Sequence, residues 1–147
     1  DTDKTISAGT KNADGSTSYD VTVTLRNTLS ELAAGDMAWY IISGDSVKRA
    51  KSDMVLEVYL FAPAGGTITN IQANGDFLSD NVFNNSWTPP PGPEPMSLAT
   101  YNGWEVHYGL TRILGETSTT ITYTVTTSPN ATSELEIDMT PQANQEL

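Results

Sequence analysis

The chain offers few residues for acid–base or nucleophilic catalysis. It has a single histidine, His107, and no cysteine, so a Ser-His-Asp arrangement would have to use that one imidazole. Thiolate nucleophiles, disulfides and cysteine-based zinc sites are excluded, and a three-histidine zinc site is impossible. His107 and Glu105 alternate with apolar residues, which predicts a strand that carries both on its polar side. We therefore expect a surface histidine without a catalytic role.

Paired carboxylates are a second route to catalysis, because a glycosidase places two acids roughly 5–10 Å apart across a cleft. Glu57 is the acid in the least expected position, within the apolar stretch Met54–Ala62. We expect it to pair with Arg26 or Arg112, or to face water, as surface carboxylates commonly do. The sequence therefore predicts no catalytic residues and a protein that is not an enzyme.

The acidic residues also raise the question of a cation site, since calcium takes six to eight oxygen ligands. The residues that could contribute are Asp1, Asp3, Asp14 and Asp20, or Asp76 with Asp80. No stretch has the spacing of an EF-hand loop. We expect these acids to be solvated, and we expect neither a metal site nor another cofactor.

The three tryptophans suggest carbohydrate binding, because flat aromatic rings stack on sugar rings. Trp39 and Trp104 occupy positions typical of core residues in strands, and one of them is expected to be the central core tryptophan. Trp87 precedes the proline-rich stretch 88–95, where it either packs on the prolines or is exposed. Because loops on rigid scaffolds carry recognition, Trp87 and Tyr101 are the candidate ligand-binding residues.

Strands must position these side chains. In Tyr19–Thr28, apolar residues alternate with polar ones, which predicts a strand with one face in a core and one in water. Further strand-like stretches lie at 37–43, 54–62, 67–73, 104–110, 118–127 and 134–140. Turn signals recur at roughly 8–12 residues, as in β-sandwiches. The predicted fold is all-β: an immunoglobulin-like sandwich of about seven to nine mostly antiparallel strands.

The alternation also predicts which side chains face the core. The inward-facing residues are expected to be Met54, Leu56, Val58, Leu60 and Ala62; Trp104, Val106, Tyr108 and Leu110; Ile121, Tyr123 and Val125; and, in a last strand, Leu135, Ile137 and Met139. The threonines from Thr120 to Thr126 are expected to form a ladder on the outer face.

Local signals predict the connections. Ser30 is suited to cap one short helical turn. Ile68 and Ile71 are out of phase by one residue, which predicts a bulge. Asn74–Gly75 is the strongest two-residue hairpin signal, and Tyr101–Trp104 reads as a second tight turn.

Composition limits the possible partners and the number of domains. With 147 residues, one domain is expected over 19–141, after a polar segment, 1–18, that holds a possible edge strand and before a tail, 142–147. The net charge of -11 disfavours nucleic acid and anionic membranes, because both attract Lys and Arg. No apolar run approaches the roughly 20 residues of a membrane span. The chain opens on Asp1 rather than on an initiator Met, so we expect an exported fragment whose anchor lies elsewhere.

Three features resemble one known family. Val21–Leu29 (VTVTLRNTL), Tyr59–Gly66 (YLFAPAGG) and Leu114–Thr117 (LGET) occur in that order, with Asn74–Asp76 between the last two. Together they resemble the C-terminal β-domain of the DUF4012 proteins, a bacterial, mostly actinobacterial, family of membrane-anchored surface proteins of unknown function. The repeated immunoglobulin-like domains of bacterial adhesins carry similar strands.

The resemblance implies a location outside the cell membrane and brings no catalytic residues with it. Ser30 stands where the family has proline, and Ala62–Gly65 matches the family pattern only approximately. The function expected is that of a non-catalytic structural or adhesive module of a cell envelope, monomeric, with cell-wall glycan or another surface protein as its partner. A carbohydrate-binding module is the alternative.

Overall fold

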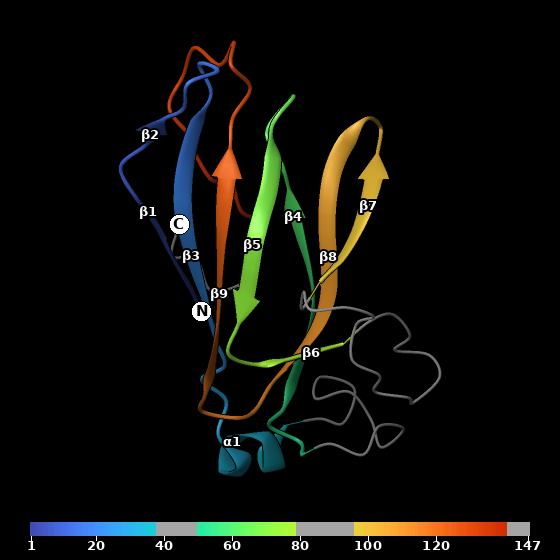
Figure 1. The fold of residues 1–147 in the computed structure, drawn as a ribbon. Coiled ribbons are helices and arrows are strands. Elements are labelled where there is room, and N and C mark those ends of the chain that lie inside the picture. The colour runs from blue at the N-terminus through green and yellow to red at the C-terminus, as the bar shows by residue number, and fades with distance from the viewer. Residues whose placement is uncertain (38–49, 79–95, 141–147) are drawn as a thin grey trace.

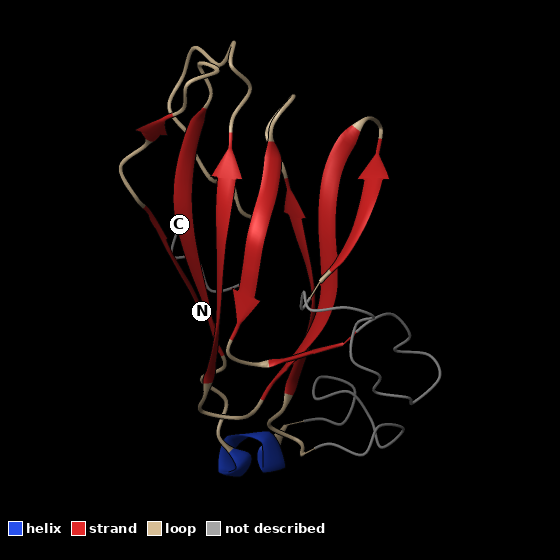
Figure 2. Cartoon of the chain, in the orientation of Figure 1, coloured by secondary structure: helices blue, strands red, loops and turns tan. Residues whose placement is uncertain are grey.

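A computed structural model describes residues 1–37, 50–78 and 96–140. The described residues form two antiparallel sheets and one short helix (Figures 1 and 2). The first sheet contains β1 (Thr2–Ile6), β2 (Thr10–Lys11), β3 (Thr17–Arg26), β9 (Ser118–Thr126) and β5 (Thr67–Ala73). The second sheet contains β4 (Met54–Phe61), β8 (Trp104–Ile113), β6 (Asp76–Leu78) and β7 (Ser97–Tyr101). The expected all-β architecture is confirmed.

The strand order explains which elements are central. The first sheet runs β1-β3-β9-β5, and β2 pairs with the first residues of β3, Thr17 and Ser18. In the second sheet β8 is central, with β4 on one side and both β6 and β7 on the other. Residues 38–43 of the expected strand at 37–43, including Trp39, lie outside the described residues, and Met37 lies just past the helix.

The helix, α1 (Glu31–Asp36), begins where the sequence predicts. The Ser30 hydroxyl accepts a hydrogen bond from the Ala33 backbone N–H at 3.2 Å, which satisfies one of the free donors of the first turn. Only Ala34 of the helix is buried. In the described part of the chain no helix is long and apolar enough to cross a membrane.

The core lies between the sheets, as the alternation of β3 and β9 predicts. β3 pairs with β9 over its length, so that Val21 lies opposite Tyr123 and Val23 opposite Ile121, and all four side chains are buried. On the outer face Thr24 and Thr120 share a hydrogen bond of 3.2 Å, and Thr124 donates to Asp20 at 3.0 Å. The expected threonine ladder is therefore present.

Two segments of the resemblance meet at one end of the sandwich. Asn27, which is buried, follows β3 and donates from its side-chain amide to the carbonyls of Ser52 (2.7 Å) and Ile113 (3.0 Å). Its backbone N–H donates to the carbonyl of Thr117 at 2.9 Å. One side chain thus joins the end of β3 to the start of β4 and the end of β8.

The strand β8 faces the opposite way from the sequence-based expectation. Its register with β4 places His107 opposite Leu60, a core residue, and Val106 opposite Phe61, which is exposed. Trp104, Val106, Tyr108 and Leu110 therefore lie on the outer face of the second sheet, so the prediction that they point into the space between the sheets is wrong. Val106 and Leu110 are nevertheless buried as expected, outside the main core cluster, whereas Trp104 is exposed. Both faces of β8 carry large or apolar groups, so its alternation does not identify the inner one.

The Asn74–Gly75 hairpin prediction is also wrong. β5 pairs with β9 in the first sheet, whereas β6 pairs with β8 in the second, so this turn crosses between sheets. Asn74 accepts the Thr120 N–H on its side chain at 2.7 Å, and a Cβ on Gly75 would lie 2.4 Å from the Thr119 hydroxyl oxygen. Glycine is needed here because β9 approaches closely. The bulge in β5 is confirmed by a register shift between Thr69 and Gln72.

The last predicted strand does not form a ladder. Residues 134–140 keep the expected alternation, with Leu135, Ile137 and Met139 half-buried and the residues between them exposed. The segment nevertheless pairs with no described strand. Leu135 and Ile137 pack against the core, and the Lys4 ammonium of β1 donates to the Ile137 carbonyl. We call residues 134–140 the C-terminal segment.

Candidate functional site

The outer face of the second sheet gathers aromatic side chains from three strands. β4 contributes Tyr59 and Phe61, β7 contributes Tyr101, and β8 contributes Trp104 and Tyr108. The register places Tyr59 directly opposite Tyr108, and Tyr101 directly opposite Trp104. We call these five residues the aromatic face. The chain has only three Trp, six Tyr and three Phe, so the concentration on one face is high.

Four side chains of the aromatic face are exposed, and three of its rings stack on one another. The exposed fractions are 49% for Tyr59, 55% for Phe61, 64% for Tyr101 and 46% for Trp104. The ring centroids of Tyr59 and Tyr108 lie 6.2 Å apart with planes inclined by 23°, and those of Tyr59 and Phe61 lie 6.4 Å apart at 29°. Cross-strand and same-face pairs of this kind hold the rings in a common orientation.

A tight turn fixes one end of the aromatic face. Asn102 and Gly103 connect β7 to β8, and both have positive φ, 51° and 82°. Two such residues in sequence are typical of a two-residue hairpin turn that matches the twist of the strands. The predicted turn is therefore present, and it brings Tyr101 and Trp104 side by side across the ladder.

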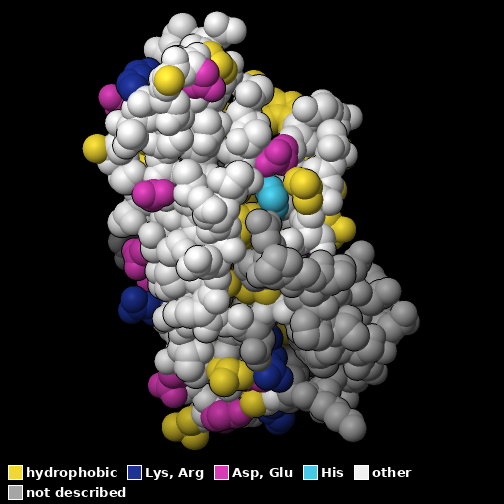
Figure 3. All heavy atoms as spheres, viewed as in Figure 1, with side chains coloured by type: hydrophobic (Ala, Val, Ile, Leu, Met, Phe, Trp, Pro, Cys, Tyr) yellow, Lys and Arg dark blue, Asp and Glu magenta, His cyan; other side chains and the backbone are white. Residues whose placement is uncertain are grey.

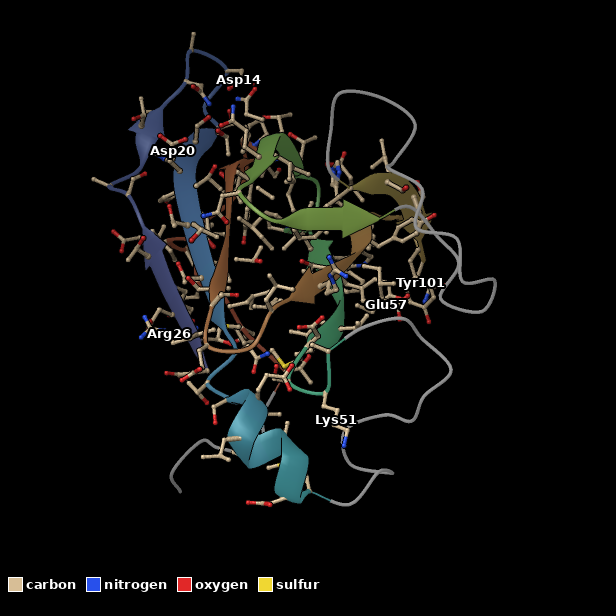
Figure 4. All side chains as sticks on the ribbon, turned by 90° about the horizontal axis from the view of Figure 1, so that it is seen from below. Asp14, Asp20, Arg26, Lys51, Glu57 and Tyr101 are labelled. Atoms are coloured by element: carbon tan, nitrogen blue, oxygen red, sulfur yellow. The ribbon has the colours of Figure 1, made fainter. Side chains whose placement is uncertain are left out.

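Two charged residues share this side of the sheet. Glu57 is exposed and lies opposite Leu110, one step along the outer face from Arg112. Figure 4 shows Glu57 and Tyr101 on the side away from the first sheet, with Arg26 on the far side of the molecule. Arg26 instead approaches Asp3 at 4.0 Å. Of the alternatives expected for Glu57, pairing with Arg26 does not occur, and exposure to solvent is confirmed.

The aromatic face can bind a flat, uncharged or weakly polar ligand. Exposed π-faces with a nearby carboxylate offer stacking together with hydrogen bonds to hydroxyl groups. An exposed group of large apolar side chains is also typical of a contact surface.

His107 is not the surface residue that the sequence predicts. It is 4% exposed, because the inner face of β8 carries it into the space between the sheets. Its Nε2 lies 3.2 Å from the Glu105 Oε1, and the same oxygen accepts the Ile68 backbone N–H at 2.7 Å. Glu105 therefore bridges β8 to β5 in the other sheet. In Figure 3 the histidine is a small cyan patch beside an acidic side chain.

The candidate cation ligands near the N-terminus are dispersed. The Asp14 carboxylate accepts hydrogen bonds from the Ser16 hydroxyl (2.6 Å) and backbone N–H (2.9 Å), which lower the pKa of Asp14 below its usual value. Asp20 bonds Thr124, and Asp1 bonds the Thr2 N–H. Among the described residues no three His, Asp or Glu side chains converge on one point. Asp80 and the side chain of Asp76 lie outside the described part.

Only one of the two predicted ligand-binding residues lies in the described part of the chain. Tyr101 is exposed and belongs to the aromatic face, whereas Trp87 lies outside the described residues. Trp104 is not the central core tryptophan, since it is 46% exposed on the outer face. The sequence reading missed Tyr59, Phe61 and Tyr108. Tyr59 and Phe61 lie on the same side of β4 as Glu57. A charged residue on that side indicates exposure to solvent, and this could have identified the two aromatic residues as exposed.

No family model, no curated protein and no solved structure matches the chain.

Proposed function

We propose that this domain is a non-catalytic adhesive module of a bacterial cell envelope, which binds cell-wall glycan through the aromatic face. The observation that carries the proposal is the set of exposed aromatic side chains of Tyr59, Phe61, Tyr101 and Trp104 on one face of the second sheet. The bacterial, extracellular setting is proposed from the resemblance of Val21–Leu29 and Leu114–Thr117 to surface proteins. The two facing antiparallel sheets support an immunoglobulin-like architecture as part of the same proposal.

The chemistry of the aromatic face favours a glycan over other partners. With a net charge of -11, the protein repels phosphate-rich polymers and anionic lipid surfaces. Sugar rings, in contrast, present apolar C–H faces to aromatic rings and hydroxyl groups to the exposed Glu57 carboxylate. Function in this fold class follows from the site and not from the sandwich itself, so the proposal is based on the aromatic face.

The test is binding of the full chain to purified peptidoglycan and to a panel of cell-wall polysaccharides, measured by pull-down and calorimetry. Replacing Trp104 or Tyr59 with alanine is expected to weaken binding about tenfold each, because aromatic contacts contribute roughly 0.5–1.5 kcal/mol beyond burial. Leu32→Ala is the matched control, since Leu32 is 83% exposed on α1, away from the aromatic face.

Unchanged glycan affinity in both aromatic variants would contradict the proposal. Binding to an isolated envelope protein that is lost in the same variants, without any glycan binding, would assign the aromatic face to a protein partner instead.

A further inference from the structure

The C-terminal segment has the sequence pattern of a strand but is not part of a sheet. Leu135, Ile137 and Met139 are half-buried, while Glu134, Glu136 and Asp138 are exposed. This alternation with period two is the pattern that extended chains use against a half-buried surface. Within the described residues, however, the segment pairs with neither β1 nor β4.

Beside the C-terminal segment lie the outer strands of the two sheets, as far as the chain is described. Among the described strands β4 pairs with β8 alone, and β1 pairs with β3 alone. An edge strand presents a row of backbone N–H and C=O groups that can accept another strand. The Lys4 side chain is the one polar contact recorded between β1 and the C-terminal segment, at the Ile137 carbonyl.

A groove separates the C-terminal segment from β4. It has a volume of about 630 Å³ and runs along β4 from Leu56 to Pro63, with residues 135–140 on its opposite side. Its floor is apolar and comes from the core of the first sheet, including Val23, Ile121 and Val125. The segment therefore closes the open side of the sandwich incompletely and leaves apolar surface uncovered.

The link to the C-terminal segment is exposed and turns sharply. After β9 the chain passes through Ser128–Ala131, where the Ala131 N–H donates to the Ser128 carbonyl at 3.0 Å. Residues 129–133 are exposed, so nothing in the core holds the turn closed. Figure 1 shows the chain doubling back at the upper end of β9. Exchange of an element between copies requires a hinge before it, and residues 129–133 provide a short, exposed hinge before the C-terminal segment.

We propose that the C-terminal segment is an exchangeable strand, which leaves its place beside the groove of its own sandwich and enters the groove of a second copy, where it adds to the β4 edge. The occupant is the segment of a second copy, because residues 135–140 already line this groove and Leu135 and Ile137 already pack against the adjoining core. Addition of an extended segment to a free sheet edge supplies the main-chain hydrogen bonds that the segment lacks in the monomer. Repeated exchange in one direction would connect copies into chains.

Charge controls the exchange. Each copy carries a net charge of -11, and the segment itself adds three exposed acids, Glu134, Glu136 and Asp138. Two copies therefore repel one another at low ionic strength, and salt screens this repulsion. Exchange is expected to increase with salt and with protein concentration.

The test measures the mass of the full chain by size exclusion with light scattering. The wild-type protein is expected to form dimers after concentration in high salt. Deleting Asn130–Thr132 prevents the segment from reaching its own groove and is expected to raise the dimer fraction at least about tenfold, because the intramolecular competitor is lost. Ile137→Asp is expected to restore the monomer in both backgrounds, because a carboxylate cannot enter the apolar groove. Glu136→Gln, on the exposed side, is the matched control and keeps the dimer.

Circular dichroism and thermal melting establish that each variant is folded, and Leu135→Asp repeats the test if Ile137→Asp is not. A folded hinge-deleted chain that stays monomeric would overturn the proposal. So would dimers that persist in the aspartate variants, since these would use another surface, or a wild-type chain that is monomeric at every concentration and salt.

Discussion

Tyr123 shows how one buried polar group makes a core sensitive to pH. The ring lies opposite Val21 in the core, and burial raises the pKa of its phenol from 10.0 to about 12. Desolvation disfavours the phenolate, so the folded state holds the proton more tightly than the unfolded chain.

The sign of the effect follows from this difference. Below pH 10 the phenol is neutral in both states, and its contribution to stability is complete. As the pH rises from 10 towards 12, the unfolded state loses its proton first, and stability falls by on the order of 2 kcal/mol. Tyr123→Phe is expected to melt like the wild type at neutral pH and to lose less stability over this alkaline range.

Melting temperature against pH measures this, with Tyr101→Phe as the exposed control that follows the wild type. A Tyr123→Phe profile identical to that of the wild type would assign the alkaline loss to other groups.

His107 and Trp104 show why single residues were placed wrongly from the sequence. The prediction from the sequence places the aromatic side of β8 in the core, since aromatic rings are usually buried. The structure reverses it: Trp104 is exposed, and His107 is buried beside Glu105. Period-two alternation separates two faces, but it does not say which one the opposite sheet covers.

At the scale of elements, Asn27 holds three segment ends together. Its amide satisfies the carbonyls of Ser52 and Ile113, and its own carbonyl oxygen accepts the Leu29 N–H at 3.1 Å. The Leu25–Thr28 stretch of the resemblance therefore has a structural role at the base of the sandwich.

Asn27→Ala is expected to destabilise the domain by about 2–4 kcal/mol, because it leaves buried carbonyls without donors. Chemical denaturation measures the loss. Asn130→Ala is the control, since Asn130 is exposed, and it should change stability by less than about 0.5 kcal/mol. A similar small change in Asn27→Ala would show that water replaces the amide.

The sequence predicts a turn correctly only where the two strands that it connects also pair with each other. Asn102–Gly103 forms the expected hairpin, because β7 and β8 are adjacent in the sequence and in the sheet. Asn74–Gly75 carries an equally strong turn signal but joins strands of different sheets. The turn residues set the local backbone, whereas the long-range partners, β9 and β8, decide where each strand goes.

For the whole molecule, the topology predicts an order of local stability. β3, β9 and β8 each have paired neighbours on both sides. The backbone N–H groups of these strands are expected to exchange with solvent most slowly, near the rate of global unfolding, and those of 131–140 fastest, since they lack ladder bonds. Hydrogen exchange followed by NMR or mass spectrometry measures this order. Protection of 134–140 equal to that of β9 would show that the segment is held as a strand in the monomer.

The sequence by itself determined the all-β class, the buried faces of β3, β4 and β9, the cap of α1, the bulge of β5 and the acidic charge, since these depend on residue type and near neighbours in the chain. Only the tertiary structure decided which face of β8 meets the core, how the turn at Asn74–Gly75 crosses between sheets, and which distant strands bring the aromatic face together. The physical reason is that strand pairing joins residues far apart in the chain. A period of two divides a strand into two faces, but it is the same whichever face is buried. Only the pairing with a partner strand shows which face meets the core.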